Sequence, residues 1–348
     1  MSGRARDRHL STILYSMAEK NIKWSILNSV KSLETIQAII NITYWARCYD
    51  NYTEDPSWLR FGHVRWITLF ALGCSPLTDT SQAVQLAHEL GIHQSSMIAR
   101  RVSLLEPHQT AEQRECSVRN YQRTWLFVFI MDKSIGVTTG RKLCVSWKDV
   151  VPNVADWWLS PSGSHCDRAT SGIVEMRVIL VGLLSYAFNS LPTAKHCLQF
   201  KALEGRRGLR KTAATVTQWQ RDVFRTLDKL RTARCASDNS ESATYLSVLA
   251  FYIDHGLLVV NAHASRDLLS IDSSQTADAA TISEQTVAVA LRLMDLFLFD
   301  PLLMKLVAGI NNMQLIMISL AATEVFHVRF AIQPPFGAVL TVYIQKGD

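Results

Sequence analysis

The residues most suggestive of chemistry are two histidines near a glutamate, in the segment His88-Glu-Leu-Gly-Ile-His93. Zinc proteases carry two histidines four positions apart on one helical face, with a glutamate beside the first. Here the histidines are five positions apart, which rotates the second by roughly 140° around a helix. Gly91 also stands between them, where it favours the end of a helix. We therefore interpret the segment as a helix end, with His93 packed or exposed, and not as a zinc site.

Other arrangements that carry chemistry are missing from the sequence. The seven cysteines are irregularly spaced, and no two form a Cys-x-x-Cys pair, so neither a metal site nor a disulfide framework is indicated. The sequence holds no glycine-rich phosphate loop and no nucleophile elbow. A helical terpene-synthase-like enzyme would need an Asp-rich metal motif, and none is present. We expect no catalytic residues, no metal ligands and no cofactor in this chain, and we predict that it is not an enzyme.

The composition favours a folded helical protein. Of the 348 residues, 48% are hydrophobic and 19% are charged, while only 15 are glycine and 9 proline, too few for the frequent turns of a strand-rich fold. The net charge of +6 is only mildly basic. The longest apolar run covers 178–188, far short of the ~20 residues that a bilayer requires. No secretory signal follows Met1. We predict an all-α protein that is soluble and makes no membrane contact.

Hydrophobic periodicity predicts the helices that must position any site. The expected helices cover roughly 10–30, 33–49, 78–90, 112–135, 171–188, 209–234, 243–270 and 282–298, with a last one after Pro301. The helix 112–135 is the strongest, because it is apolar on nearly every side, as a central buried helix would be. Asp132 shares a face with Trp125 in that helix. A buried carboxylate needs a partner, and we expect Arg141 or the amides of the 136–141 loop to supply it. A direct role of Asp132 in ligand contact is the alternative.

The segment Gln122-Arg-Thr-Trp-Leu-Phe-Val-Phe-Ile-Met-Asp132, followed by Gly140-Arg141, resembles the middle homology region of fungal zinc-cluster transcription factors. That family shows Arg-x-Trp, an aromatic stretch, Leu-Asp-Arg and then Gly-Arg-Pro or Gly-Lys-Pro. Asp149-Val-Val-Pro-Asn and Ala87-His-Glu-Leu-Gly-Ile-His93 resemble two further family patterns, and Ser32-Leu-Glu-Thr-Ile resembles an earlier helix. The similarity spans residues 32 to about 158. It implies that five residues are motif or structural positions: Arg123, Trp125, Asp132, Gly140 and Arg141.

This sequence departs from the family in two ways. Lys142 replaces the usual proline, and Met-Asp-Lys replaces Leu-Asp-Arg, which are mild changes. The six-cysteine cluster that binds two zinc ions and reads DNA in this family is missing from the chain. The resemblance therefore implies either a truncated gene product or the regulatory part alone, with zinc and DNA bound only through the missing module.

The function that the resemblance implies is control of RNA polymerase II transcription in the nucleus. The expected organisation is one domain with a helical lead-in over 1–31, a homology core over 32–160 and a C-terminal helical part over 161–348. The expected partners are the transcription machinery, a second copy of the chain and a small-molecule effector bound between helices. The alternative function is a helical protein–protein interaction module with no direct DNA role. A basic run that could serve nuclear import contains Arg206, Arg207, Arg210 and Lys211.

One segment interrupts the resemblance. Removal of Val64–Gln82 would join Ser57-Trp-Leu-Arg-Phe-Gly-His63 directly to Ala83-Val-Gln-Leu-Ala-His, which reads as the family pattern without a break. Codons for Val64 and Gln82 can supply GT and AG ends, and whole codons would be lost. We predict that Val64–Gln82 is a retained intron, with a genuine insertion as the alternative.

Overall fold

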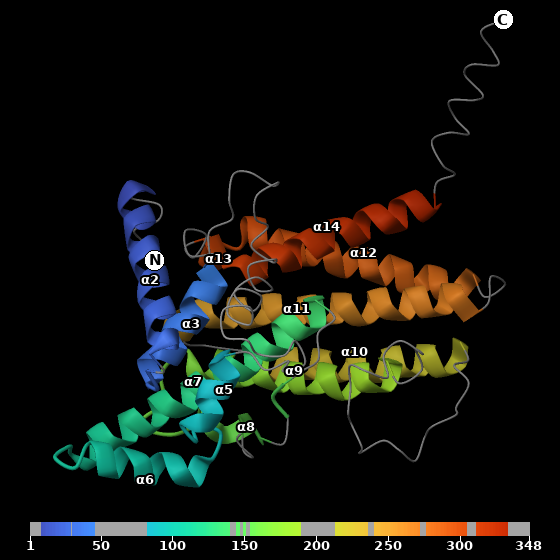
Figure 1. The fold of residues 1–348 in the computed structure, drawn as a ribbon. Helices are drawn as coiled ribbons and strands as arrows, with labels where there is room; N and C mark the ends of the chain where they lie inside the picture. The colour runs from blue at the N-terminus through green and yellow to red at the C-terminus, as the bar shows by residue number, and fades with distance from the viewer. Residues whose placement is uncertain are drawn as a thin grey trace, which may run out of the picture.

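The fold is seen in a computed structural model (Figure 1). It describes residues 8–28, 30–45, 82–139, 144–146, 149–150, 154–188, 213–235, 240–271, 276–304 and 311–332. Within these ranges every regular element is a helix and no strand is present, so the predicted all-α class is confirmed. The helices are α2 Arg8–Leu27, α3 Leu33–Trp45, α5 Gln82–Glu89, α6 Ser95–Leu105, α7 Ala111–Thr139, α8 Val154–Trp157, α9 Asp167–Phe188, α10 Ala213–Cys235, α11 Ser240–Ile271, α12 Thr276–Phe299, α13 Pro301–Met304 and α14 Asn312–Ile332.

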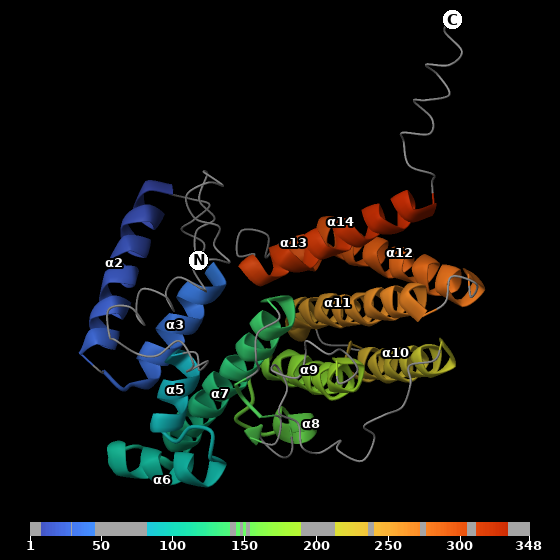
Figure 2. The same ribbon diagram turned by 45° about the vertical axis from the view of Figure 1, so that its right-hand side comes forward.

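Helix α11 lies at the centre of the C-terminal part (Figures 1 and 2). Helices α9 and α10 pack on one side of it, and α12 and α14 lie on the other. Helix α7 crosses from this bundle to the N-terminal helices, where it contacts α3, α5 and α6. The buried apolar side chains form one continuous cluster that runs from Leu33 in α3 to Ala321 in α14. Helix α7 therefore joins the two ends of a single core.

The stretch Ala243–Leu268 of α11 is long and apolar enough to cross a membrane. Its hydrophobicity has another physical cause, because 72% of its most apolar window is buried inside the protein. The side chains from Phe251 to Ala262 are all buried among the neighbouring helices. A helix surrounded on every side needs an apolar surface all round. The sequence of α11 is thus that of a core helix.

The predicted helices differ from the observed ones mainly at their ends. The stretch 136–139, which we predicted as loop, is the last turn of α7, since the single Gly136 weakens a helix by only about 1 kcal/mol. Helix α6 was not predicted. It buries only Ile98 and Val102, so its sequence carries little helical periodicity. The stretches 46–49, 78–81 and 209–212 lie outside the described residues, as does all of the proposed intron except Gln82, the first residue of α5.

Candidate functional site around helix α7

Arg123 is the first of the motif residues on α7, and it binds a buried carboxylate. Its Nε and Nη2 donate to the two oxygens of Asp167 at 2.7 and 2.8 Å. Arg119, one turn earlier, donates to the same carboxylate at 3.0 Å and to the carbonyl oxygen of Trp157 at 2.9 Å. Its guanidinium also lies over the Trp157 ring, 3.9 Å from the centroid. Two arginines of α7 therefore fasten it to the first residue of α9.

The cluster sets two guanidinium charges, those of Arg119 and Arg123, against the single carboxylate of Asp167. The side chain of Asp167 is fully buried. Burial by itself raises the pKa of Asp167, but the hydrogen bonds from Arg123 and from the Ser164 amide, with the two guanidinium charges, lower the pKa below its ordinary value. The carboxylate therefore stays ionised, and its stabilising effect depends on that charge.

Trp125 is the second motif residue and lies at the centre of the N-terminal core. It is 1% exposed, as predicted. The prediction of a buried helix holds for the second half of α7, where 124–134 are buried except Phe127 and Asp132, but most of 112–123 is exposed or half-buried. Its indole N–H donates to the carbonyl oxygen of Asp149 at 2.8 Å. Asp149 belongs to the downstream segment of the family resemblance. The two patterns, 24 positions apart in sequence, thus meet through one hydrogen bond.

Asp132 is paired with backbone amides that follow the predicted 136–141 loop, while Arg141, the other predicted partner, lies outside the described residues. Its oxygens accept hydrogen bonds from the backbone amides of Cys144 at 3.0 Å and Val145 at 3.0 Å, and Lys133 Nζ lies 2.8 Å away. Lys133 also donates to the carbonyl of Val145. The predicted 136–141 loop is helix up to Thr139, so the amides that reach Asp132 come from farther along the chain. Asp132 therefore locks the end of α7 to the segment after it.

The remaining predicted site residues cannot be placed. Gly140, Arg141 and the basic run with Arg206, Arg207, Arg210 and Lys211 lie outside the described residues. The residues that sequence reasoning missed are Asp167, Arg119 and Lys133. Arg119 could have been found, since it precedes Arg123 by four positions and two arginines on one buried face require a carboxylate. Nothing local in the sequence marks Asp167 as that carboxylate.

The histidine pair shows how Gly91 shapes this region. Gly91 has φ +68°, a conformation that glycine adopts without strain, and it ends α5 by turning the chain back. His93 consequently lies against His88, with ring centroids 4.3 Å apart and ring planes tilted by 49°, and both rings lie near Trp125. Among the described residues no three His, Cys, Asp or Glu side chains gather as metal ligands. His88 and His93 therefore pack against Trp125, and no third metal-ligating side chain joins them among the described residues.

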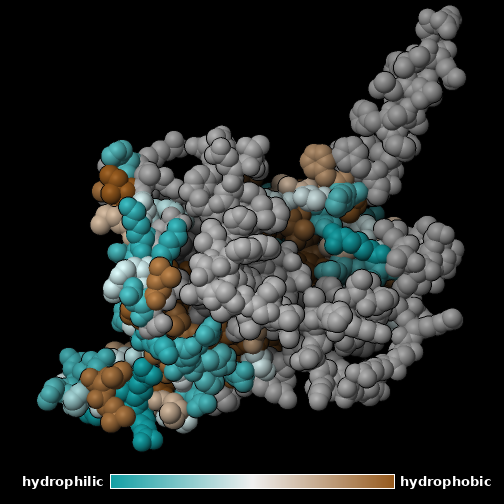
Figure 3. Space-filling view, viewed as in Figure 1, coloured by the Kyte–Doolittle hydropathy of each residue, from teal (hydrophilic) through white to brown (hydrophobic). Residues whose placement is uncertain are grey.

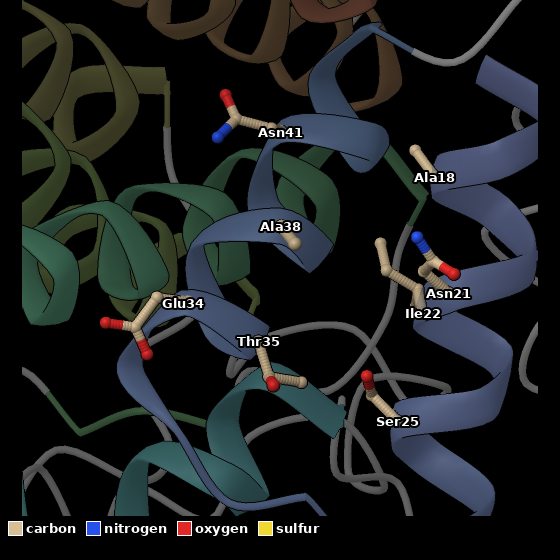
Figure 4. Close-up of a pocket in the computed structure, with 8 residues that line it drawn as sticks. All are labelled: Ala18, Asn21, Ile22, Ser25, Glu34, Thr35, Ala38 and Asn41. Atoms are coloured by element: carbon tan, nitrogen blue, oxygen red, sulfur yellow. The ribbon is translucent and has the colours of Figure 1, made fainter. Parts of the chain in front are cut away.

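A second candidate surface lies on α2. Figure 4 shows an open groove between α2 and α3, which α2 lines with Ala18, Asn21, Ile22 and Ser25. The larger apolar residues of α2 remain exposed to solvent: Ile13 44%, Leu14 55%, Met17 55%, Trp24 61% and Leu27 66%. Figure 3 shows such hydrophobic side chains among hydrophilic ones on α2, at the left of the view. Ile13, Met17, Trp24 and Leu27 recur at the spacing of a heptad seam, with Lys20 in the remaining position.

Comparison with known proteins adds no further constraint. No protein-family model, no curated protein and no solved structure matches this chain. The features that bear on function are therefore the contacts around α7 and the exposed face of α2.

Proposed function

We propose that this chain is the helical regulatory region of a fungal zinc-cluster transcription factor. It acts in the nucleus on RNA polymerase II transcription and has no catalytic activity. DNA is bound through a zinc-cluster module that is absent from this sequence, and no cofactor is held by the chain itself. Its partners are the transcription machinery and a small-molecule effector.

The observation that supports this proposal is the position of the motif residues. Arg123, Trp125 and Asp132 lie along one helix, and each joins α7 to a different point of the segment 144–167. Residues in such positions hold a scaffold together and touch no reacting group. This arrangement explains why a family could share the motif without sharing a ligand or a DNA target.

The proposed mechanism is conformational. Helix α7 contacts both the N-terminal helices and α9 of the C-terminal bundle. A ligand or protein that binds one relative arrangement of these parts more tightly than another shifts the population toward it. Such a shift would mask or release an activation segment elsewhere in the polypeptide.

Sequencing of the transcript and genomic DNA upstream of the Met1 codon tests the link to a DNA-binding module. The proposal predicts an in-frame exon that encodes six cysteines with zinc-cluster spacing. An upstream region that is complete, is transcribed with this chain and encodes no such cluster would count against it.

The exposed face of α2 favours a second function, association with another copy of the chain. A heptad seam is self-complementary, so two α2 helices can bury the side chains of Met17, Trp24 and Leu27 against each other. The residues that α2 turns toward α3 are not those of the seam, and Met17, Trp24 and Leu27 stay exposed. In this alternative the chain is a helical interaction module that dimerises and has no direct DNA role.

Sedimentation equilibrium distinguishes a dimer from a monomer. The wild-type chain is expected to dimerise, and Met17→Glu is expected to make it monomeric by placing a charge in the seam. Leu104→Glu on α6 is the matched control, since Leu104 is 71% exposed and lies outside the seam. A monomeric wild-type chain, or equal dissociation by both variants, would rule the seam out.

A further inference from the structure

The C-terminal bundle buries an arginine that has no carboxylate. Three arginines are buried in the described part of the chain: Arg119, Arg177 and Arg234. Arg119 pairs with Asp167, and Arg234 pairs with Glu175. Arg177, on α9, is 1% exposed and has no ion-pair partner among the described residues. An arginine cannot escape this by losing its proton, and an unpaired charge in a protein interior costs several kcal/mol.

The groups around Arg177 do not neutralise it. The Tyr252 ring lies 6.0 Å from the guanidinium carbon, the outer limit of a cation–π contact. Tyr44 of α3 and His255 of α11 are the other titratable groups that face it. Burial, and then the Arg177 charge, lower the pKa of His255 to about 3, so this imidazole is neutral near pH 7. The titratable groups around the cation are therefore neutral.

The unused hydrogen-bonding atoms define the shape of the missing partner. Nε and Nη2 of Arg177 have no acceptor in the described part of the chain, and neither ring nitrogen of His255 has a partner there. Nε and Nη2 form the edge of the guanidinium with which Arg123 grips Asp167 and Arg292 grips Asp254. That edge matches the two oxygens of a planar carboxylate. In Arg177 the same edge is empty.

The backbone brings these groups together at a close helix crossing. A Cβ atom on Gly256 of α11 would lie 3.3 Å from the sulfur of Met176, beside Arg177 on α9. Glycine at this position lets the two helices approach, which places Arg177 against Tyr252 and His255. Tyr44 closes the cluster from α3, so the site lies where the N-terminal helices meet the bundle. Met176 and Leu180 are the apolar neighbours at this crossing.

We propose that Arg177 and His255 form a binding site for the carboxylate group of a small molecule, with the guanidinium edge holding both oxygens and the imidazole N–H donating a further hydrogen bond. Binding of the carboxylate requires only the folded chain. The use of this site by a regulatory effector rests, in addition, on the proposed function. Because α3, α9 and α11 all border the site, occupancy would favour the arrangement in which the two ends of the core are closed together.

Thermal unfolding of the full chain in sodium acetate tests the proposal, with sodium chloride at equal ionic strength as the reference. We expect a saturable rise in Tm with acetate, on the order of 3 °C, because a ligand that binds only the folded state stabilises it. Arg177→Met should abolish the acetate response. Arg234→Met is the matched control, since it removes a buried arginine that has its own carboxylate, and it should lower Tm but keep the response.

A second variant keeps the test decisive if Arg177→Met does not fold. Arg177→Lys preserves the charge but lacks the two-nitrogen edge, so the acetate concentration for half-maximal effect should rise at least tenfold. The proposal is overturned if acetate gives no more stabilisation than chloride, which would indicate that water satisfies these donors, or if the arginine variants respond like wild type. Acetate binding without any effect on transcription would leave the site standing and remove only the regulatory role.

Discussion

Replacement of Asp167 by asparagine removes the charge that holds α7 to α9 and leaves the volume of the side chain almost unchanged. Arg119 and Arg123 then lose their shared counter-charge while their side chains stay 6% and 23% exposed. Loss of one partner from a buried ion pair costs about 3–5 kcal/mol. Arg123 can turn partly toward water and Arg119 keeps the Trp157 carbonyl, so we expect the lower end, about 3 kcal/mol.

Urea unfolding followed by circular dichroism measures this loss, and its pH dependence identifies the cause. The folded-state pKa of Asp167 is lowered, so its contribution is complete above the unfolded pKa, near 3.8, and is lost as pH falls toward the folded value. The difference in free energy of unfolding between wild type and Asp167→Asn should therefore be constant near pH 7 and should disappear below about pH 4. Asp222→Asn, at an exposed position of α10, is the control and should change stability by less than about 0.5 kcal/mol. An Asp167→Asn variant as stable as this control would show that the charge of Asp167 does not stabilise the fold.

Four other outcomes are expected. Trp125→Ala should destabilise the chain by about 3–5 kcal/mol through a core cavity, whereas Trp24→Ala, at a 61% exposed site, should not; comparable urea midpoints would contradict this. Stability should fall as pH drops from 6.5 toward 3, because His255 takes up a proton in the unfolded chain but stays neutral when buried in the folded one. In urea titrations, His255→Phe should reduce this dependence of the free energy of unfolding on pH. The purified chain should show no sequence-specific binding to duplex DNA at ~200 mM salt in mobility-shift assays. Spliced transcripts should lack the codons of Val64–Gln82, and their retention in every messenger would end that hypothesis.

Much of the fold could be predicted from the sequence because its helices are long and strongly periodic. The burial of Trp125 followed from the apolar surface of α7 alone. The partners of its polar residues did not, since Asp167 lies 44 positions from Arg123 and begins a separate helix. Arg177 was also missed, because an arginine in an apolar helix looks the same in sequence whether it reaches the surface or points inward. Local patterns predict which faces are buried, whereas tertiary packing decides which charges meet.

A reporter assay tests the central claim most directly. The full chain would be inserted between a heterologous DNA-binding domain and an activation segment, with Asp167→Asn and the exposed Asp222→Asn carried in parallel. If the chain is a regulatory region, its folded form represses the reporter, and Asp167→Asn relieves that repression at equal protein level while Asp222→Asn does not. Reporter activity that is unaffected by the chain, or is changed equally by both variants, would contradict the proposed function.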